Sequence, residues 1–196
     1  MRKLTYLVAT SIDGFIAEAG GGDPTSTPGF FVNEGDHNAA LLRDYPEMIP
    51  TVARPVFGLE DVPNKEFDTV LEGRGSYEVG LAAGLDDAYE HLRHVVFSTT
   101  MTEARGKVEL VATDPVEKVR ELKREAGQKL WLVGGATLAN ALRDEIDEIV
   151  VKMHPVVAGA GMPMFGGEFR PERYHLARHE AFESGVLVLT YTRIES

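Results

Sequence analysis

Short apolar runs alternate along the chain with longer polar or turn-rich segments. Six of these runs have the length and composition of buried strands. They cover residues 3–9, 68–72, 95–98, 108–111, 130–133 and 148–157. Because helical patterns separate several of them, the alternation favours a mostly parallel sheet covered on both faces. Two further runs, 176–183 and 186–193, flank Ser184-Gly185 and predict an antiparallel hairpin near the C-terminal end.

The clearest helix signal begins at Asp114. This residue type is a favoured N-cap, and Pro115 suits the first helical position. Apolar residues at every third position then form one stripe on the predicted helix. They are Val116, Val119 and Leu122.

Two segments between the first and second predicted strands differ in character. Residues 36–44 predict a helix, whereas residues 20–35 are rich in Gly, Pro, Thr and Asp and predict a loop. Residues 45–67 contain four prolines, so regular structure is not expected there. We interpret 45–67 as an excursion from the sheet that acts either as a lid or as an oligomer contact.

Residues 129–142 contain the most informative pattern, in which an apolar run is followed by Gly134-Gly135 and then by a helix-forming run that opens with Ala136. Glycine lacks a Cβ, so a ligand can approach its main chain closely. The free N–H groups of the first helical turn favour an anion. The pattern therefore fits a phosphate site, and it fits equally well a tight strand-to-helix turn without a ligand.

Composition narrows the class of protein. A length of 196 residues is enough for one domain with its own core, and we expect a single domain spanning 1–196. The absence of cysteine excludes disulfides and thiolate chemistry. The net charge of −11 argues against a nucleic-acid partner, although one or two arginines in a cleft can hold a nucleotide phosphate. No apolar run approaches the ~20 residues of a membrane span, so a cytoplasmic protein without a membrane partner is expected.

Four glycine or hydroxyl clusters follow predicted strands. They are Ser11-Ile12-Asp13-Gly14, Gly73-Arg74-Gly75-Ser76, Ser98-Thr99-Thr100 and Gly134-Gly135-Ala136-Thr137. In an open α/β sheet, ligands bind outside the carboxyl ends of the strands. Hydroxyls, backbone N–H groups and one arginine at that edge suit a phosphate-bearing dinucleotide. Neither the G-x-G-x-x-G fingerprint nor a Walker A lysine motif occurs, which argues against the usual Rossmann and P-loop sites.

This set of motifs resembles the dihydrofolate reductase-like superfamily, and most nearly the reductase domain of the bifunctional riboflavin-biosynthesis deaminase-reductases and its stand-alone relatives. The resembling segments are 11–17, 73–78, 96–100, 132–138 and 155–165, in family order. The resemblance implies an α/β, dihydrofolate reductase-like three-layer fold with a mostly parallel central sheet and a C-terminal antiparallel hairpin. The zinc deaminase domain is not expected, because its cysteines and H-x-E motif are missing, and the scattered histidines suggest no metal site.

NADPH is the cofactor that the resemblance implies. Arg74 and Ser76 would hold phosphates, with Arg74 the best candidate for the adenosine 2′-phosphate, and Ala9 and Ile16 would flank the nicotinamide. The implied cofactor-binding set is Ala9, Ile16, Gly73, Arg74, Ser76, Ser98, Thr99, Val133, Gly134, Gly135, Ala136, Thr137 and Leu138. The alternative roles are plain core for Ala9 and Ile16, and an ion pair with Glu78 or a helix cap for Arg74.

The same resemblance assigns the remaining parts of the cofactor. Ser98 and Thr99 would line the adenosine side, and residues 134–138 would cradle the pyrophosphate. The Gly134-Gly135 peptide is expected to be cis, because the corresponding Gly-Gly peptide is cis in dihydrofolate reductases.

Two departures from the riboflavin-type pattern bear on the substrate. The first motif of those reductases resembles K-x-A-x-S-L-D-G, and its lysine position is Leu7 here. They carry E-G-G where this chain has Val133-Gly134-Gly135. Apolar residues at both positions make the site drier, which argues against the phosphoribosyl-aminopyrimidine substrate while leaving cofactor binding intact.

Hydride transfer requires a substrate held against the nicotinamide and a group that supplies a proton. Dihydrofolate reductases use a carboxylate from the helix after the first loop, and the candidates here are Glu34 and Asp36, next to His37. Riboflavin-type enzymes place the aspartate of the first motif, here Asp13, at the substrate. Helix capping is the alternative role of Asp36, and a local turn that of Asp13. His154 either faces the site or lies in the core.

Three functions follow from these observations. The preferred one is an NADPH-dependent reductase of a small heterocycle, resembling 5-amino-6-(5-phosphoribosylamino)uracil reductase of riboflavin biosynthesis. The second is a dihydrofolate or pterin reductase, against which the missing Trp and Leu landmarks after the first loop argue. The third is a non-catalytic nucleotide-binding protein of the same fold. A homodimer is expected, because the resembling reductases are commonly homodimers.

Overall fold

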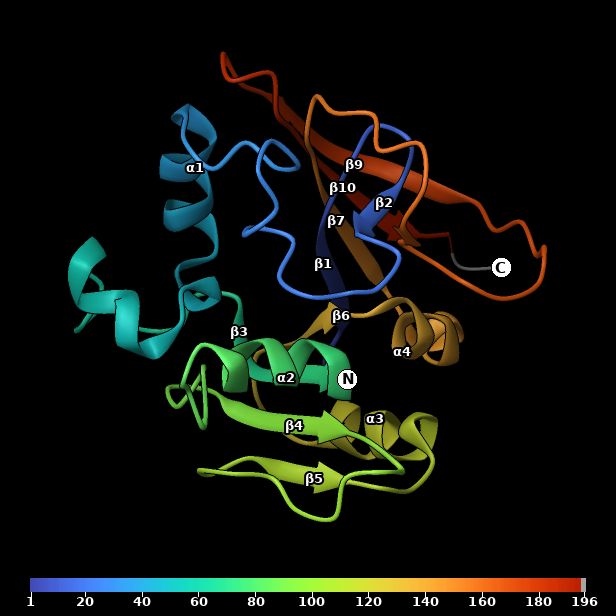
Figure 1. Cartoon of the computed structure of the whole chain (residues 1–196). Helices are drawn as coiled ribbons and strands as arrows, with labels where there is room; N and C mark the ends of the chain where they lie inside the picture. Colours follow the sequence, from blue (N-terminus) through green and yellow to red (C-terminus); the bar gives the residue numbers. More distant parts are fainter. Residues whose placement is uncertain (195–196) are drawn as a thin grey trace.

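An eight-stranded sheet forms the centre of the computed structural model, which describes residues 1–194 (Figure 1). Its order is β5-β4-β3-β6-β1-β7-β10-β9. The six parallel strands are β1 (Leu4–Thr10), β3 (Phe67–Gly73), β4 (Arg93–Phe97), β5 (Glu109–Val111), β6 (Lys129–Gly134) and β7 (Glu148–Met153). The antiparallel hairpin of β9 (Tyr174–Ala181) and β10 (Leu187–Arg193) extends the sheet beyond β7. The α/β class, the mostly parallel sheet and the C-terminal antiparallel pair are therefore confirmed.

Helices cover both faces of the sheet and make three layers (Figure 1). On one face, α3 (Pro115–Arg124) and α4 (Ala136–Ala141) contribute to a core cluster with Leu4, Tyr6 and Val8 of β1. On the other face, the segment that follows α1 (Asp36–Asp44) packs on a second cluster, to which Leu7 belongs. α2 (Arg74–Ala82) covers β3 and β4. Burial on both faces explains why the strands are continuous apolar runs rather than alternating ones.

The helix that was predicted most clearly begins as expected. The Asp114 carboxylate caps α3 by accepting a 2.8 Å hydrogen bond from the Val116 N–H. The three α-helices that begin after glycines, α1, α2 and α4, have no such side-chain cap.

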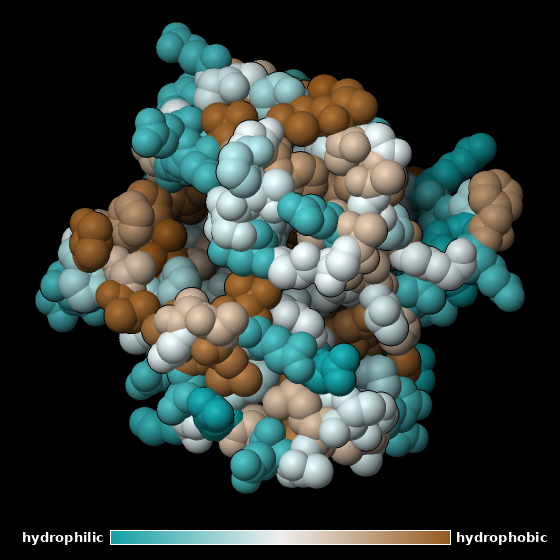
Figure 2. Space-filling view, viewed as in Figure 1, coloured by the Kyte–Doolittle hydropathy of each residue, from teal (hydrophilic) through white to brown (hydrophobic). Residues whose placement is uncertain are grey.

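The proline-rich segment differs from the prediction, because it contains two 3-10 helices, η1 (Pro46–Met48) and η2 (Thr51–Phe57). Two buried charged side chains bind the backbone there. Arg54 donates to the carbonyls of Pro46, Leu59 and Val62, each within 2.9 Å. Glu47 accepts from the N–H groups that lead into β3. Apolar side chains gather on the surface of this part of the molecule (Figure 2).

Smaller differences concern short elements. The strand predicted at 148–157 ends at Met153, shortly before Pro155. The short pair β2 (Phe15–Ala17) and β8 (Met162–Pro163) was not predicted and connects the first motif to the glycine-rich segment near residue 160. Within residues 1–194, no helix combines the length and apolar character needed to cross a lipid bilayer.

Candidate functional site

The parallel strands bring their carboxyl ends to one edge of the sheet, where β3 and β6 are neighbours. Their register places Glu72 opposite Gly134. A Cβ added to Gly73 would lie 3.8 Å from the Gly134 carbonyl oxygen and 3.9 Å from the Gly135 nitrogen. The Gly134-Gly135 peptide is cis, as expected. Two glycine turns that are about sixty residues apart in the chain therefore lie against one another.

Both turns lead directly into helices, and both N-cap positions are glycines. α2 begins at Arg74 after Gly73, and α4 begins at Ala136 after Gly135. A Cβ added to Gly75, in the first turn of α2, would meet open space. The first-turn N–H groups of α2 are thus left without a side-chain cap beside an open surface, which is an arrangement that accepts an anion.

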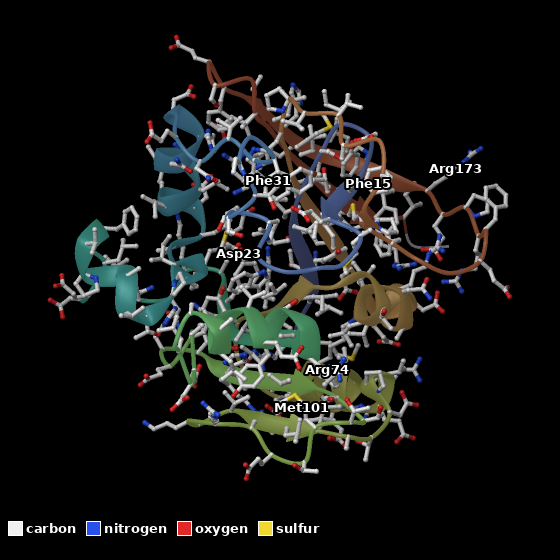
Figure 3. All side chains as sticks on the ribbon, in the orientation of Figure 1. Phe15, Asp23, Phe31, Arg74, Met101 and Arg173 are labelled. Atoms are coloured by element: carbon white, nitrogen blue, oxygen red, sulfur yellow. The ribbon has the colours of Figure 1, made fainter. Side chains whose placement is uncertain are left out.

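Arg74 lies at this open surface, close to the end of β4, where Figure 3 labels it beside Met101. Its Nη1 donates a 3.0 Å hydrogen bond to Thr100 Oγ1, and its Nε lies 3.6 Å from Glu78 Oε1. The alternative pairing with Glu78 is therefore present. Both side chains of that pair are about half exposed, so the pair is weak and leaves the guanidinium available.

The loop after β4 is shaped by its own hydroxyls. Ser98 Oγ accepts from the N–H groups of Thr100 and Met101, at 3.2 and 3.1 Å. Thr99 is exposed on the same loop. Ser98 therefore holds the loop that presents Thr100 to Arg74. Thr100 was not among the predicted site residues, although it belongs to the hydroxyl cluster that drew attention to this loop.

Glu72, the residue before Gly73, has a buried carboxyl group whose Oε1 lies 3.7 Å from His94 Nε2. Burial, and secondarily the charge of Asp87, raise the pKa of Glu72 to about 8. Glu72 is therefore mainly protonated at neutral pH. It adds no full negative charge to the sheet edge where an anion would bind.

The other predicted cofactor residues divide between the edge and the core. Ala9 is half-buried in β1 and pairs with Lys152 of β7. Ile16 and Leu138 lie in the same core cluster, so the core alternative describes Ile16. The remaining predicted positions lie next to the glycine turns along the chain. Ser76 and Val133 are half-buried, Ala136 is buried, and Thr137 is exposed.

Asp13 is bound on both carboxylate oxygens. Its Oδ1 accepts from Ser11 Oγ at 2.6 Å and from the Ala158 N–H at 3.0 Å, and its Oδ2 accepts from the Gly159 N–H at 2.7 Å. These hydrogen bonds, chiefly that from Ser11, lower the pKa of Asp13 to about 2. Asp13 therefore lies in the expected local turn, where it binds Ser11, and it also binds a distant loop. A carboxylate held ionised in this way is a poor proton donor.

Asp36 also has a structural partner. Its carboxylate accepts from the N–H groups of Glu183 and Ser184, at 2.8 and 3.1 Å, and these bonds lower its pKa. Gly35 holds the N-cap position, so Asp36 anchors α1 to the β9–β10 turn instead of capping its own helix. Glu34 is exposed. None of the three predicted proton donors therefore lies in an enclosed site.

Two histidines are buried together, His37 in the first turn of α1 and His154 just after β7. His154 Nδ1 accepts from the Val32 N–H at 2.9 Å, and its ring stacks on Phe31. Burial, followed by the charges of Lys152 and His37, lowers the pKa of His154 to about 3. The His37 ring lies 6.0 Å from that of His154, and burial lowers its pKa as well. Both rings are neutral, and His154 is a core residue.

A hollow of about 260 Å³ lies between α1, the two 3-10 helices and β7. Apolar side chains such as Leu42, Met48 and Phe57 line most of it, and Asn33 and Asn38 supply amides. Lys152 enters it from β7. Sequence reasoning missed this lysine, although it stands in an otherwise apolar stretch of a predicted buried strand. Leu7, at the lysine position of the riboflavin-type motif, is buried in the core instead.

Comparison with known proteins identifies a family over most of these features. Residues 67–188 match the family described as the RibD C-terminal domain. This span contains both glycine turns, Arg74 and Lys152. Two proteins of Bacillus subtilis (strain 168), both described as uncharacterized, are 29% identical to the chain. YyaP aligns over 70% of this chain and 79% of its own length, and YwjB over 84% and 83%.

Solved structures share the fold. A putative riboflavin biosynthesis protein from Shewanella sp. PV-4 superposes with a TM-score of 0.70 at 23% identity, over 98% of this chain and 99% of that one. A diaminohydroxyphosphoribosylaminopyrimidine deaminase/5-amino-6-(5-phosphoribosylamino)uracil reductase from Thermotoga maritima superposes with a TM-score of 0.63 at 16% identity. The alignment covers 98% of this chain and 57% of that enzyme.

Proposed function

Because the chain belongs to the RibD C-terminal domain family, we propose that it is a cytoplasmic, NADPH-dependent reductase of a small heterocyclic compound. The observation that carries the proposal is the meeting of Gly73 with Gly134-Gly135 beside Arg74, at the carboxyl edge of the sheet. Bare main chain, an uncapped helix start and a guanidinium converge there, and each of them favours phosphate.

The residues present fit the cofactor. Arg74 and the first turn of α2 bind phosphate, and Thr100 holds the guanidinium in place. The main chain of Gly134-Gly135 has no Cβ to keep a pyrophosphate at a distance. Because Glu72 is mainly protonated, its side chain does not repel a phosphate bound at this edge. Bound NADPH would supply a hydride.

The hollow beside β7 is the place for the substrate. Ala9, expected at the nicotinamide, is the strand neighbour of Lys152, which enters the hollow. The residue expected at the nicotinamide is thus the neighbour, in the adjacent strand, of a residue that lines the hollow.

The substrate differs from that of the riboflavin pathway. Leu7 and Val133 stand where the riboflavin-type pattern has charged residues, and Leu7 is buried in the core. A pterin reductase is also disfavoured, because within residues 1–194 no Asp or Glu lines the hollow. Asp36, the nearest candidate on α1, binds the hairpin backbone.

The test is a titration of NADPH and NADH into the purified protein, followed by nicotinamide fluorescence. We expect saturable binding with a preference for NADPH, and loss of the nicotinamide absorbance band when a suitable heterocycle is added. Binding without turnover over a broad panel of heterocycles would favour the non-catalytic nucleotide-binding alternative. Failure of both nucleotides to bind would refute the proposal.

A further inference from the structure

Lys152 is a half-buried cation without a counter-charge. It lies in β7 between Ala9 of β1 and Val188 of β10, and its side chain enters the hollow. Among residues 1–194, no carboxylate lies within 4.0 Å of its Nζ. Burial alone lowers its pKa, with no acidic group offsetting the effect.

The other lysines that are largely withdrawn from water have partners. Lys123 Nζ lies 2.7 Å from Asp147 Oδ2 and donates to the Glu145 carbonyl. Lys129 Nζ lies 2.8 Å from Glu66 Oε2 and 3.1 Å from Glu148 Oε1. Desolvating an ammonium costs free energy unless an anion compensates it. Lys152 is therefore an exception to the rule that the rest of the chain follows.

Among residues 1–194, those that line the hollow around Lys152 include no carboxylate. The hollow is lined by apolar residues, two asparagines and Tyr45. His37 and His154, the titratable groups that interact with Lys152, are buried and neutral. The site thus offers a single positive charge, two amides and flat apolar walls.

We propose that Lys152 binds an anionic oxygen of the substrate, and that the substrate is a planar ring compound carrying a carboxylate or an enolate oxygen. The volume of about 260 Å³ suits one ring or two fused rings. The asparagines at the rim supply hydrogen bonds to ring heteroatoms. Calling this ligand the substrate rests on the proposed function. The binding site itself is defined by the hollow and by Lys152.

The test uses two ligands of equal shape and different charge, 2-naphthoate and 2-naphthamide, measured by isothermal calorimetry without any nicotinamide cofactor. We expect wild-type protein to bind naphthoate at least about tenfold more tightly than naphthamide, as a charge-assisted contact implies. Lys152→Met should remove this preference while naphthamide affinity stays within about twofold. Lys152→Arg should retain it, because the charge is kept.

Lys65→Met is the matched control, because Lys65 is about half exposed and does not line the hollow. It should leave the preference unchanged. Circular dichroism and thermal melting check that every variant folds. Equal binding of the two ligands, absence of naphthoate binding, or a preference that survives in Lys152→Met would each overturn the proposal. Since NADPH plays no part in this experiment, its outcome is independent of the cofactor titration.

Discussion

Asp13 and Asp36 show that an aspartate at a candidate catalytic position can have a structural role instead. Each was a candidate proton donor, and each instead accepts hydrogen bonds from the backbone of a segment far along the chain. Besides the neighbouring Ser11, the partners of Asp13 are Ala158 and Gly159, about 145 residues along the chain, and the local sequence pattern does not predict these distant partners. The sequence located the motif, whereas the role of its aspartate depended on a tertiary contact.

Asp13→Asn should lower stability in a pH-dependent way. The pKa of Asp13 falls from 3.8 to about 2 on folding, so the native state favours the ionised form. Its contribution is fully present above about pH 4 and is lost as the pH falls through about 2. We expect a lower melting temperature than wild type at pH 7 and a shrinking difference towards pH 2. The exposed Asp61→Asn variant is the control, and a difference that is constant with pH would contradict this account.

Arg74→Ala tests the phosphate assignment at a single side chain. A charge-assisted contact to the 2′-phosphate exists only with NADPH, so its loss should weaken NADPH by about 1–3 kcal/mol more than NADH. Fluorescence titration of both nucleotides measures the difference. Arg105→Ala removes an exposed arginine that pairs with Asp86 and should change neither affinity. If Arg74→Ala lowers the affinities for NADPH and NADH equally, Arg74 does not bind the 2′-phosphate.

Elements buried on both faces were predictable, because their apolar runs are uninterrupted. The helix at Asp36–Asp44 matches its prediction, and the parallel strands lie within about two residues of theirs at most ends. α2 was missed, because glycines at 75 and 80 lower its helix propensity, and packing of Tyr77 against the sheet overrides that weakness. The 3-10 helices were missed because Arg54 and Glu47 gave no local sign of their backbone contacts.

The glycine turn after β6 permits a test at the level of this element. A Cβ at Gly135 would lie 3.6 Å from Met162 Sδ, an ordinary contact, and its φ of −86° suits any residue. Gly135→Ala should therefore fold normally, while its methyl group covers main chain that phosphate approaches. We expect NADPH affinity to fall by roughly tenfold. Gly80→Ala, within α2 and beside Ala88, is the matched control. Unchanged NADPH affinity in folded Gly135→Ala would exclude this turn from the cofactor site.

The molecule as a whole places two kinds of surface along one sheet edge. β3, β4 and β6 lead into glycines, hydroxyls and Arg74, whereas Lys152 of β7 borders the apolar hollow. Family membership agrees with the resemblance drawn from five loose motifs in order. The adjacency of β3 and β6 was not predicted, because periodicity finds strands without ordering them. Lys152 was not predicted either, because its importance depends on the lack of a carboxylate among the described residues that line the hollow.

The proline-rich segment has an exposed apolar surface that bears on the expected assembly. Val52, Val56 and Phe57 of η2 are 64%, 83% and 50% exposed, and such a cluster marks an interaction surface. We predict a homodimer of about 43 kDa, twice the 21.5 kDa chain, by light scattering after size exclusion. Val56→Asp should shift the mass to that of one chain, because a desolvated carboxylate disrupts an apolar contact.

Phe169→Asp is the control, because Phe169 is equally apolar and 96% exposed but lies outside the proline-rich segment. It should remain dimeric. A monomeric wild type would refute the homodimer. A dimer that tolerates Val56→Asp but loses affinity for ring compounds would assign η2 to the alternative role of a lid, because Phe57 lines the hollow that contains Lys152.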